Sequence, residues 1–186
     1  MTVSLLHRHT IGISRRELLQ VGYTGLLGIG LCVGIFQTCG RLGLRINVSP
    51  SLPVGLYIST GSGSLVEFCP VEPFASVALA RGYRTPGACA DGGAPLLKPV
   101  IATTGDAVNT SPNGLDVNNI RIPNSAPFAA DSEGRPLTHW PFGRYAVSEG
   151  TVWVASSYNS RSFDSRYFGP IPVTAIRGRV KPLLSF

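Results

Sequence analysis

The sequence predicts a mostly β domain of coiled antiparallel strands with one short helix, preceded by a single membrane-spanning helix. Three observations support this fold class. A segment of 23 residues, 18–40, contains no charged side chain. Beyond it, short runs of apolar and β-branched residues alternate with turn dipeptides. The chain also holds 22 glycines and 15 prolines, which favours a turn-rich β fold over a helical bundle.

The apolar segment is long enough to cross a bilayer at 1.5 Å per residue. Basic side chains precede it, which places the N-terminus in the cytoplasm. Residues 14–19 also resemble a twin-arginine export signal, but no A-x-A-like cleavage site follows, so an uncleaved anchor is favoured. The expected segments are therefore a cytoplasmic N-terminus (1–17), an inner-membrane helix (18–40) and a periplasmic domain (41–186).

The folded domain is expected to consist of nine short strands. Turn dipeptides such as Gly105-Asp106, Asn113-Gly114 and Glu149-Gly150 separate them. A short helix is expected over residues 73–83. The expected strands are 55–60, 64–68, 96–103, 107–109, 115–117, 120–122, 145–147, 151–156 and 176–183.

Two cysteines beyond the apolar segment, Cys69 and Cys89, lie 20 residues apart. In an oxidising periplasm they are expected to form a disulfide, worth about 3 kcal/mol through loop closure. The alternative is two buried free thiols. The chain has no C-x-x-C motif, and His139 is its only histidine past the apolar segment. We therefore expect no metal site and no cofactor.

The net charge of +6 comes almost wholly from arginine, with 14 Arg against two Lys. A basic protein could bind nucleic acid. Here, however, the arginines are scattered and form no basic helix. A solvated surface next to a membrane explains the charge better, and no nucleic-acid partner is expected.

The first stretch with chemical potential is N-V-S-P-S-L-P-V-G-L-Y, residues 47–57. Its two prolines fix φ and push Ser49 and Leu52 toward extended geometry. A serine such as Ser51 in this irregular turn can present both its hydroxyl and its backbone N–H to a substrate. The alternative is a membrane-exit loop with no chemistry.

Lys98 occupies the centre of a second, apolar stretch, residues 94–102, in a chain that otherwise uses arginine. Burial can lower the pKa of a lysine by about 3–5 units, and a neutral amine can take the proton of a serine hydroxyl. The alternative is a lysine facing solvent. A third stretch, 156–172, is rich in serine, and its Asp164 and Arg166 could form an ion pair.

Together these three stretches resemble the signal peptidase I superfamily of Ser/Lys serine proteases. K-P-V-I-A-T-T-G-D, residues 98–106, resembles that family's K-R-x-x-G-x-P-G-D box, and S-F-D-S-R-Y-F-G, residues 162–169, resembles its S-x-D-S-R-x-x-G box. Within the superfamily, N-x-S-x-S-x-P-x-G-L-Y followed by L-L-K-P-V is similar to the TraF-type conjugative transfer peptidases. Leu52, Pro99 and Thr104 depart from the general family and agree with this branch.

The resemblance implies a signal-peptidase-like fold and a role for each matching residue. Ser51 matches the nucleophile and Lys98 the general base. Ser49 matches a hydroxyl that forms the oxyanion hole with the Ser51 backbone N–H. The supporting residues are a serine that hydrogen-bonds the lysine and a charged pair that holds its loop: Ser162, Asp164 and Arg166.

The implied substrate is a pilin precursor of a conjugation system or another preprotein. Its processed product could be linear or cyclic. Four alternatives remain open. The chain could be a general signal peptidase acting on many secreted preproteins, or a non-enzymatic, single-pass component of a secretion apparatus. Ser49 could be the nucleophile in place of Ser51. Finally, His139 could belong to a catalytic triad.

Overall fold

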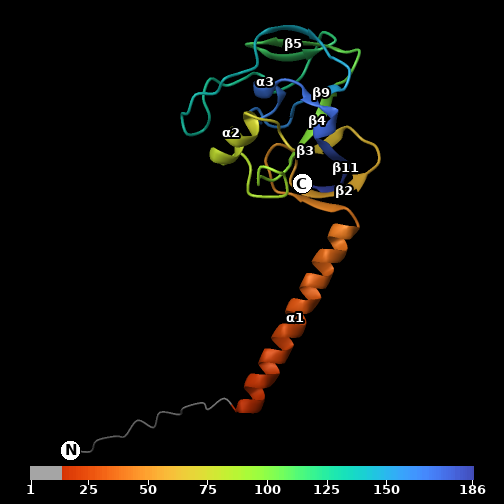
Figure 1. Cartoon of the computed structure of the whole chain (residues 1–186), viewed down its shortest axis with the longest axis vertical. Coiled ribbons are helices and arrows are strands. Elements are labelled where there is room, and N and C mark those ends of the chain that lie inside the picture. Colours follow the sequence, from red (N-terminus) through yellow and green to blue (C-terminus); the bar gives the residue numbers. More distant parts are fainter. Residues whose placement is uncertain (1–13) are drawn as a thin grey trace, which may run out of the picture. The chain divides into compact units, whose positions relative to one another are not determined.

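The computed structural model describes residues 14–186, apart from the side chains of residues 35, 36 and 39. It separates the helix α1 (Arg15–Arg41) from a folded domain, Leu42–Phe186 (Figure 1). A reciprocal capping box starts α1, because Glu17 N donates to Ser14 Oγ (3.3 Å) and Ser14 N donates to Glu17 Oε2 (2.8 Å). Its Arg15–Gly34 portion is long and apolar enough to cross a membrane. Most of the expected basic N-terminus, Arg8 included, lies outside the described residues.

The folded domain is built on a curled sheet of seven antiparallel strands. From one edge to the other the strands are β1 (Leu44–Asn47), β2 (Gly55–Thr60), β11 (Ile176–Ser185), β3 (Leu65–Phe68), β4 (Leu96–Ala102), β9 (Thr151–Val154) and β10 (Ile171–Pro172). The last strand, β11, thus lies between the early strands β2 and β3 and pairs with both. This crossover ties the end of the sequence to its beginning.

A second, four-stranded sheet lies between β4 and β9 in the sequence. Its strands, in spatial order, are β7 (Ile120–Arg121), β6 (Gly114–Val117), β5 (Ala107–Ser111) and β8 (Gly143–Ala146). Three short helices complete the domain: α2 (Phe74–Ala80), α3 (Ser165–Phe168) and the 3₁₀ helix η1 (Val173–Ala175).

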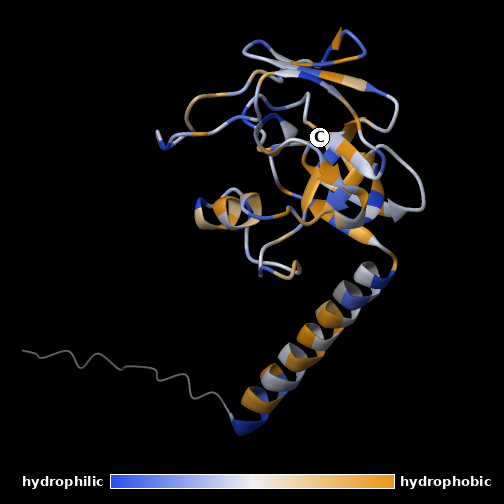
Figure 2. Ribbon diagram, turned by 45° about the horizontal axis from the view of Figure 1, so that its top comes forward, coloured by the Kyte–Doolittle hydropathy of each residue, from blue (hydrophilic) through white to orange (hydrophobic). Residues whose placement is uncertain are grey.

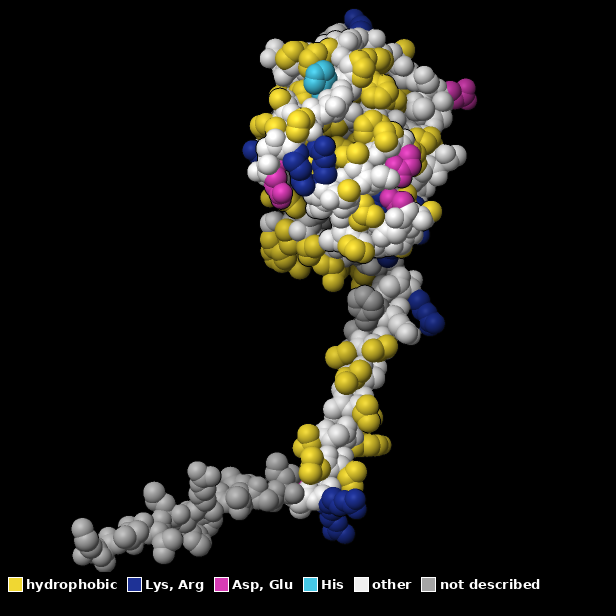
Figure 3. Space-filling model, turned by 60° about the vertical axis from the view of Figure 1, so that its left-hand side comes forward, with side chains coloured by type: hydrophobic (Ala, Val, Ile, Leu, Met, Phe, Trp, Pro, Cys, Tyr) yellow, Lys and Arg dark blue, Asp and Glu magenta, His cyan; other side chains and the backbone are white. Residues whose placement is uncertain are grey.

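Strand β9 joins the hydrophobic cores of the two sheets. Successive side chains of a strand point to opposite faces, so Val152 and Val154 enter the core that contains Val66 and Phe68, whereas Trp153 enters the core that contains Val108. All three β9 side chains are buried. Figure 2 shows hydrophobic residues along the strands of the larger sheet and along α1. Figure 3 shows a domain surface on which hydrophobic side chains are widely exposed and charged ones are few.

The predicted mostly β class agrees with this structure, and the helix expected over residues 73–83 corresponds to α2. All nine expected strands are present with bounds shifted by up to two residues. The prediction missed β1, β10, α3 and η1. β1 is a four-residue edge strand that carries Arg45 next to the apolar segment, so it was indistinguishable from a linker. β10 has two residues, one of them Pro172. α3 is a single turn of four residues, too short to show a helical period in the sequence.

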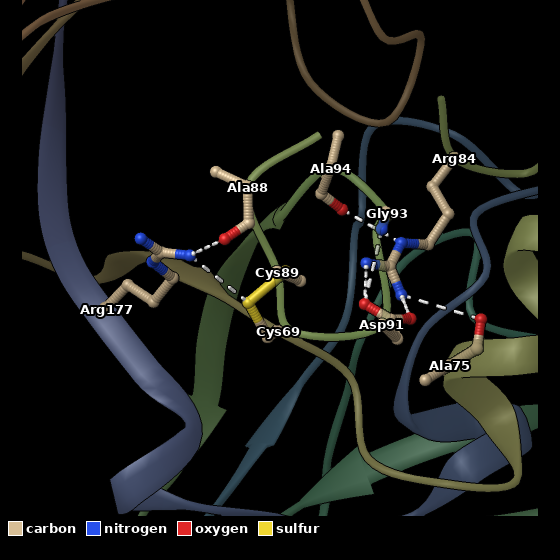
Figure 4. The surroundings of a disulfide bond; sticks show 9 residues. All are labelled: Cys69, Ala75, Arg84, Ala88, Cys89, Asp91, Gly93, Ala94 and Arg177. Carbon is tan, nitrogen blue, oxygen red and sulfur yellow. Dashed lines mark hydrogen bonds and ion pairs between the residues drawn. A yellow bond between two sulfur atoms is a disulfide. The ribbon is translucent and has the colours of Figure 1, made fainter. Parts of the chain in front are cut away.

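The expected disulfide joins Cys69 to Cys89, with Cα atoms 5.8 Å apart, and it closes the excursion between β3 and β4 that contains α2 (Figure 4). Arg84 braces the same excursion. Its guanidinium binds both carboxylate oxygens of Asp91 (2.7 and 3.0 Å), and its Nε donates to Ala94 O (2.9 Å). Any side chain at Gly93 would strike this guanidinium, since a Cβ there would lie 2.2 Å from it.

We expect replacement of both disulfide cysteines by serine to lower the free energy of unfolding by about 3 kcal/mol, because the unfolded chain regains the loop entropy that the bridge removes. Denaturant unfolding of the full chain in detergent measures this. Cys32→Ser is the matched control, since Cys32 is a free, exposed cysteine on α1. An unchanged unfolding midpoint in the double variant would contradict the expectation.

Candidate active site

The three stretches singled out in the sequence meet at one cleft of about 540 Å³. The loop between β1 and β2 forms one wall, the beginning of β4 another, and the loop between β9 and α3 a third. The lining residues used below are Asn47, Ser49, Ser51, Lys98, Asn159 and Arg161.

The loop that carries Ser51 is folded around a single asparagine. Asn47 ends β1 and is buried; its Nδ2 donates to the carbonyls of Ser49 (3.1 Å), Leu52 (3.2 Å) and Pro53 (3.1 Å). Its Oδ1 accepts the N–H of Ser49 (3.2 Å). The loop has no ladder hydrogen bonds of its own, so this side chain satisfies its inward-facing backbone groups.

Lys98 lies in the middle of β4 and is only 2% exposed. The alternative of a lysine facing solvent is therefore wrong. Its Nζ is hydrogen-bonded to Ser51 Oγ, and no other hydrogen bond of this amine is found among residues 14–186. The site thus joins a buried amine to a half-buried hydroxyl.

Burial lowers the pKa of Lys98 to about 8, because the charged form loses its hydration. Two nearby charges act in opposite directions. The Asp164 carboxylate raises the lysine pKa, and the Arg166 guanidinium lowers it. Since these two charges are paired, burial decides the outcome. At pH 7 about a tenth of the amine is neutral, the form that can accept a proton.

Hydrogen bonds from the third stretch hold the Ser51 loop in place. The Ser156 hydroxyl donates to Ser51 O, and Asn159 Nδ2 donates to Pro50 O (3.1 Å). Ser162 Oγ lies 3.5 Å from Ser51 Oγ. This differs from the expected contact between Ser162 and the lysine; within the described chain Ser162 points at the hydroxyl that Lys98 also contacts.

Asp164 and Arg166 form a bidentate ion pair, and both side chains are fully buried. Arg166 Nε binds Asp164 Oδ1 (2.8 Å), and Nη2 binds Oδ2 (3.0 Å). The other three N–H groups donate to the carbonyls of Ser160 (2.7 Å), Asn124 (2.8 Å) and Ser156 (3.0 Å). All five donors of the guanidinium are used, which no other side chain can reproduce.

The carboxylate of Asp164 organises the same loop from the other side. Its Oδ1 accepts the N–H of Arg166 (3.3 Å) and so caps α3, while its Oδ2 accepts the N–H of Ser156 (3.0 Å). Ser156 follows β9 and holds Ser51. The ion pair therefore positions the Ser51 loop through a single intermediate residue, Ser156.

Two further sequence hypotheses can be located in the structure. Ser49 Oγ accepts the backbone N–H of Ser51 at 3.4 Å, so the two groups assigned to the oxyanion hole are neighbours. His139 lies elsewhere: its ring stacks on Phe142, with centroids 3.9 Å apart, and its Nδ1 contacts Trp140 O. His139 is not among the residues that line the cleft.

Sequence reasoning missed the residues that hold the Ser51 loop. Asn47 starts the N-x-S-x-S pattern, so its place in the motif could have drawn attention to it. Ser156 and Asn159 belong to a loop, residues 155–164, with four serines, and nothing in the sequence separates them from their neighbours.

Comparison with known proteins places the chain in a family. Residues 17–184 match the model of signal peptidase, peptidase S26. Among curated proteins, the conjugal transfer protein TraF of Agrobacterium fabrum is 38% identical over 94% of this chain and 99% of its own length. The plasmid transfer protein TraF of Escherichia coli is 37% identical over 77% of this chain and 84% of its own. A crystal structure of a signal peptidase I from Enterococcus faecalis aligns with a TM-score of 0.34 and 18% identity over 63% of this chain and 92% of that one.

The chain therefore belongs to the signal peptidase family, peptidase S26. Within that family it is a homologue of the conjugal transfer proteins TraF. This assignment rests on the sequence matches, and it agrees with the resemblance drawn from the three stretches.

We expect Arg166→Lys to lower the free energy of unfolding by at least about 2 kcal/mol, because lysine has three donors and leaves buried acceptors unpaired. Denaturant unfolding of the full chain measures this. Arg144→Lys, on the exposed part of β8, is the control and should leave stability unchanged. Equal stability of the two variants would show that the five-donor network is dispensable.

Proposed function

We propose that the chain is a membrane-anchored serine endopeptidase in which Ser51 is the nucleophile and Lys98 the general base. One observation carries this proposal: the amine of a buried lysine contacts the hydroxyl of Ser51 in a cleft large enough for an extended peptide. The peptidase family of the chain supports the reaction class. The contact of Lys98 with Ser51, and not with Ser49, favours Ser51 over its neighbour as nucleophile.

The chemistry follows from this contact. The neutral Nζ of Lys98 takes the proton of Ser51 Oγ as the oxygen attacks the scissile carbonyl. The Ser51 N–H exchanges its long bond to Ser49 Oγ (3.4 Å) for the oxyanion. Together with the Ser49 hydroxyl it stabilises this charge, and one such donor is worth about 3 kcal/mol. The Lys98 ammonium then gives the proton to the departing amine, and an ester on Ser51 remains.

The acyl-enzyme can be resolved in two ways. Water yields a linear product, and an amine of the substrate yields a cyclic one with a new peptide bond. Relatives named as plasmid and conjugal transfer proteins support a pilin precursor of a conjugation system as substrate. The family description also covers signal peptidases, so a general preprotein is the comparison substrate.

We place the enzyme in the inner membrane, with α1 as a single span and residues 42–186 in the periplasm. The outer face of the sheet supports a position at a membrane, because Ile46, Leu56 and Leu184 form one apolar row across β1, β2 and β11, with Ile46 74% and Leu184 56% exposed. An alkaline phosphatase reporter fused to the C-terminus should be active. An inactive reporter on an intact fusion would contradict this orientation.

We expect Ser51→Ala and Lys98→Ala each to abolish precursor processing while the protein stays folded. Lys98→Arg should be equally inactive, because arginine does not supply a neutral nitrogen. Lys181→Ala is the matched control, since Lys181 is the only other lysine and is exposed. Processing by Lys98→Arg at the wild-type rate would exclude the general-base role.

The pH dependence provides an independent check on Lys98. Because the amine must lose its proton before it can act as a base, kcat/KM should rise about tenfold per pH unit below pH 8 and level off above it. A profile measured from pH 6 to 9.5 on a fixed substrate tests this. A rate that falls between pH 7 and 8 has the opposite sign and would contradict the assignment.

Mass spectrometry of a co-expressed pilin precursor identifies the reaction. We expect the precursor to lose a peptide in the presence of the wild-type enzyme and to stay intact with Ser51→Ala. A product lighter by one further water is cyclic. Cleavage of a generic preprotein in preference to the pilin precursor would favour a general signal peptidase, and failure of a penem to acylate Ser51 would favour a structural component.

A further inference from the structure

Among the charged side chains that line the cleft, one is exposed and has neither an ion-pair partner nor a side-chain hydrogen bond within the described residues. Four ionisable residues carry charges along its walls, and three of them have partners. Arg84 is paired with Asp91, and Asp131 with Arg135 at 2.6 Å. Lys98 contacts Ser51. The fourth is Arg161.

Arg161 is exposed and has no carboxylate within ion-pair distance in the described part of the chain. All ten Asp and Glu residues of the sequence fall within that part. The guanidinium lies over the ring of Phe128, with Cζ 4.9 Å from the ring centroid. A cation on an aromatic face is held by the ring's quadrupole, and its N–H edge stays free to bind a ligand.

Residues of α3 and of the loop between β9 and α3 hold Phe128 and Arg161 in place. The backbone N–H of Phe128 donates to the hydroxyl of Tyr167 (3.0 Å), a buried residue of α3, and this bond fixes the backbone that carries the ring. The backbone N–H of Arg161 donates to Asn159 Oδ1 (2.8 Å). The same asparagine binds Pro50 O, next to the nucleophile.

Arg161 is also close to the reacting hydroxyl. Its chain neighbour Ser162 lies 3.5 Å from Ser51 Oγ. Consecutive Cα atoms are 3.8 Å apart, and an extended peptide advances about 3.3 Å per residue. A group held by Arg161 therefore belongs to a substrate residue within about four positions of the scissile bond.

We infer that Arg161 on Phe128 is a specificity site for a carboxylate of the substrate close to the bond that Ser51 attacks. This inference rests on the proposed peptidase function and adds the chemistry of the substrate. A planar guanidinium matches the two oxygens of a carboxylate, and such pairs are among the stronger hydrogen bonds. The carboxylate comes either from an acidic side chain or from the free C-terminus of a short leaving peptide.

The probes are quenched fluorescent decapeptides incubated with the full-length enzyme in detergent. One series carries a single Glu or Gln at each of four positions on either side of the scissile bond. A second series ends two to four residues after that bond with a free or an amidated C-terminus. At one position the carboxylate should improve kcat/KM about tenfold, which corresponds to about 1.4 kcal/mol. The gain should appear in KM, because Arg161 touches no reacting atom.

Arg161→Ala should abolish this preference, and Arg161→Glu should reverse it in favour of Lys at the same position. Preference in the first series identifies an acidic side chain, and preference in the second the peptide terminus. Arg144→Ala, an equal change of net charge on β8, is the control and should keep the preference.

Cleavage without any carboxylate preference, or an equal loss of preference in Arg144→Ala, would overturn the inference while leaving the peptidase intact. No cleavage of any peptide, together with no acylation of Ser51 by a penem, would instead refute the proposed function. The two failures are thus distinguishable.

Discussion

The site depends on the removal of water from one amine. Lys98 sits on β4 between strands that bury their apolar side chains, and only 2% of its surface is exposed. An ammonium ion in that position has lost its hydration without gaining a direct carboxylate partner. Its proton is therefore held weakly, and the nearest polar group is the Ser51 hydroxyl. Burial is the main cause of the lowered pKa of this lysine.

The ion pair of Asp164 and Arg166 places two opposite charges near Lys98, and their effects on the lysine pKa oppose each other. An unpaired aspartate beside Lys98 would favour the charged amine, whereas the paired guanidinium offsets it. The same pair occupies carbonyls of the loop that holds Ser51. A single buried cluster thus serves two needs: electrostatic balance near the lysine and geometric support for the serine.

The sequence singled out the three stretches that line the cleft, but not the residues that hold them together. Two prolines around Ser51, a lysine in an apolar run and a box with Asp164 and Arg166 were each visible as local patterns. The residues that connect them were not. Asn47 stabilises its loop by binding carbonyls up to six positions away, and Ser156 reaches Ser51 across 105 positions. A hydrogen bond between distant residues leaves no periodic trace in either segment.

What the sequence determined by itself is the β framework and the family, because strand alternation, turn residues and short motifs are local properties. Only the tertiary structure decided which hydroxyl the amine contacts, which side of β4 is buried, and which unpaired arginine lies at the cleft. These outcomes depend on distances between segments. Three arginines illustrate this. Arg84 binds Asp91 within the β3–β4 excursion, Arg161 is open to the cleft, and Arg166 makes five side-chain hydrogen bonds.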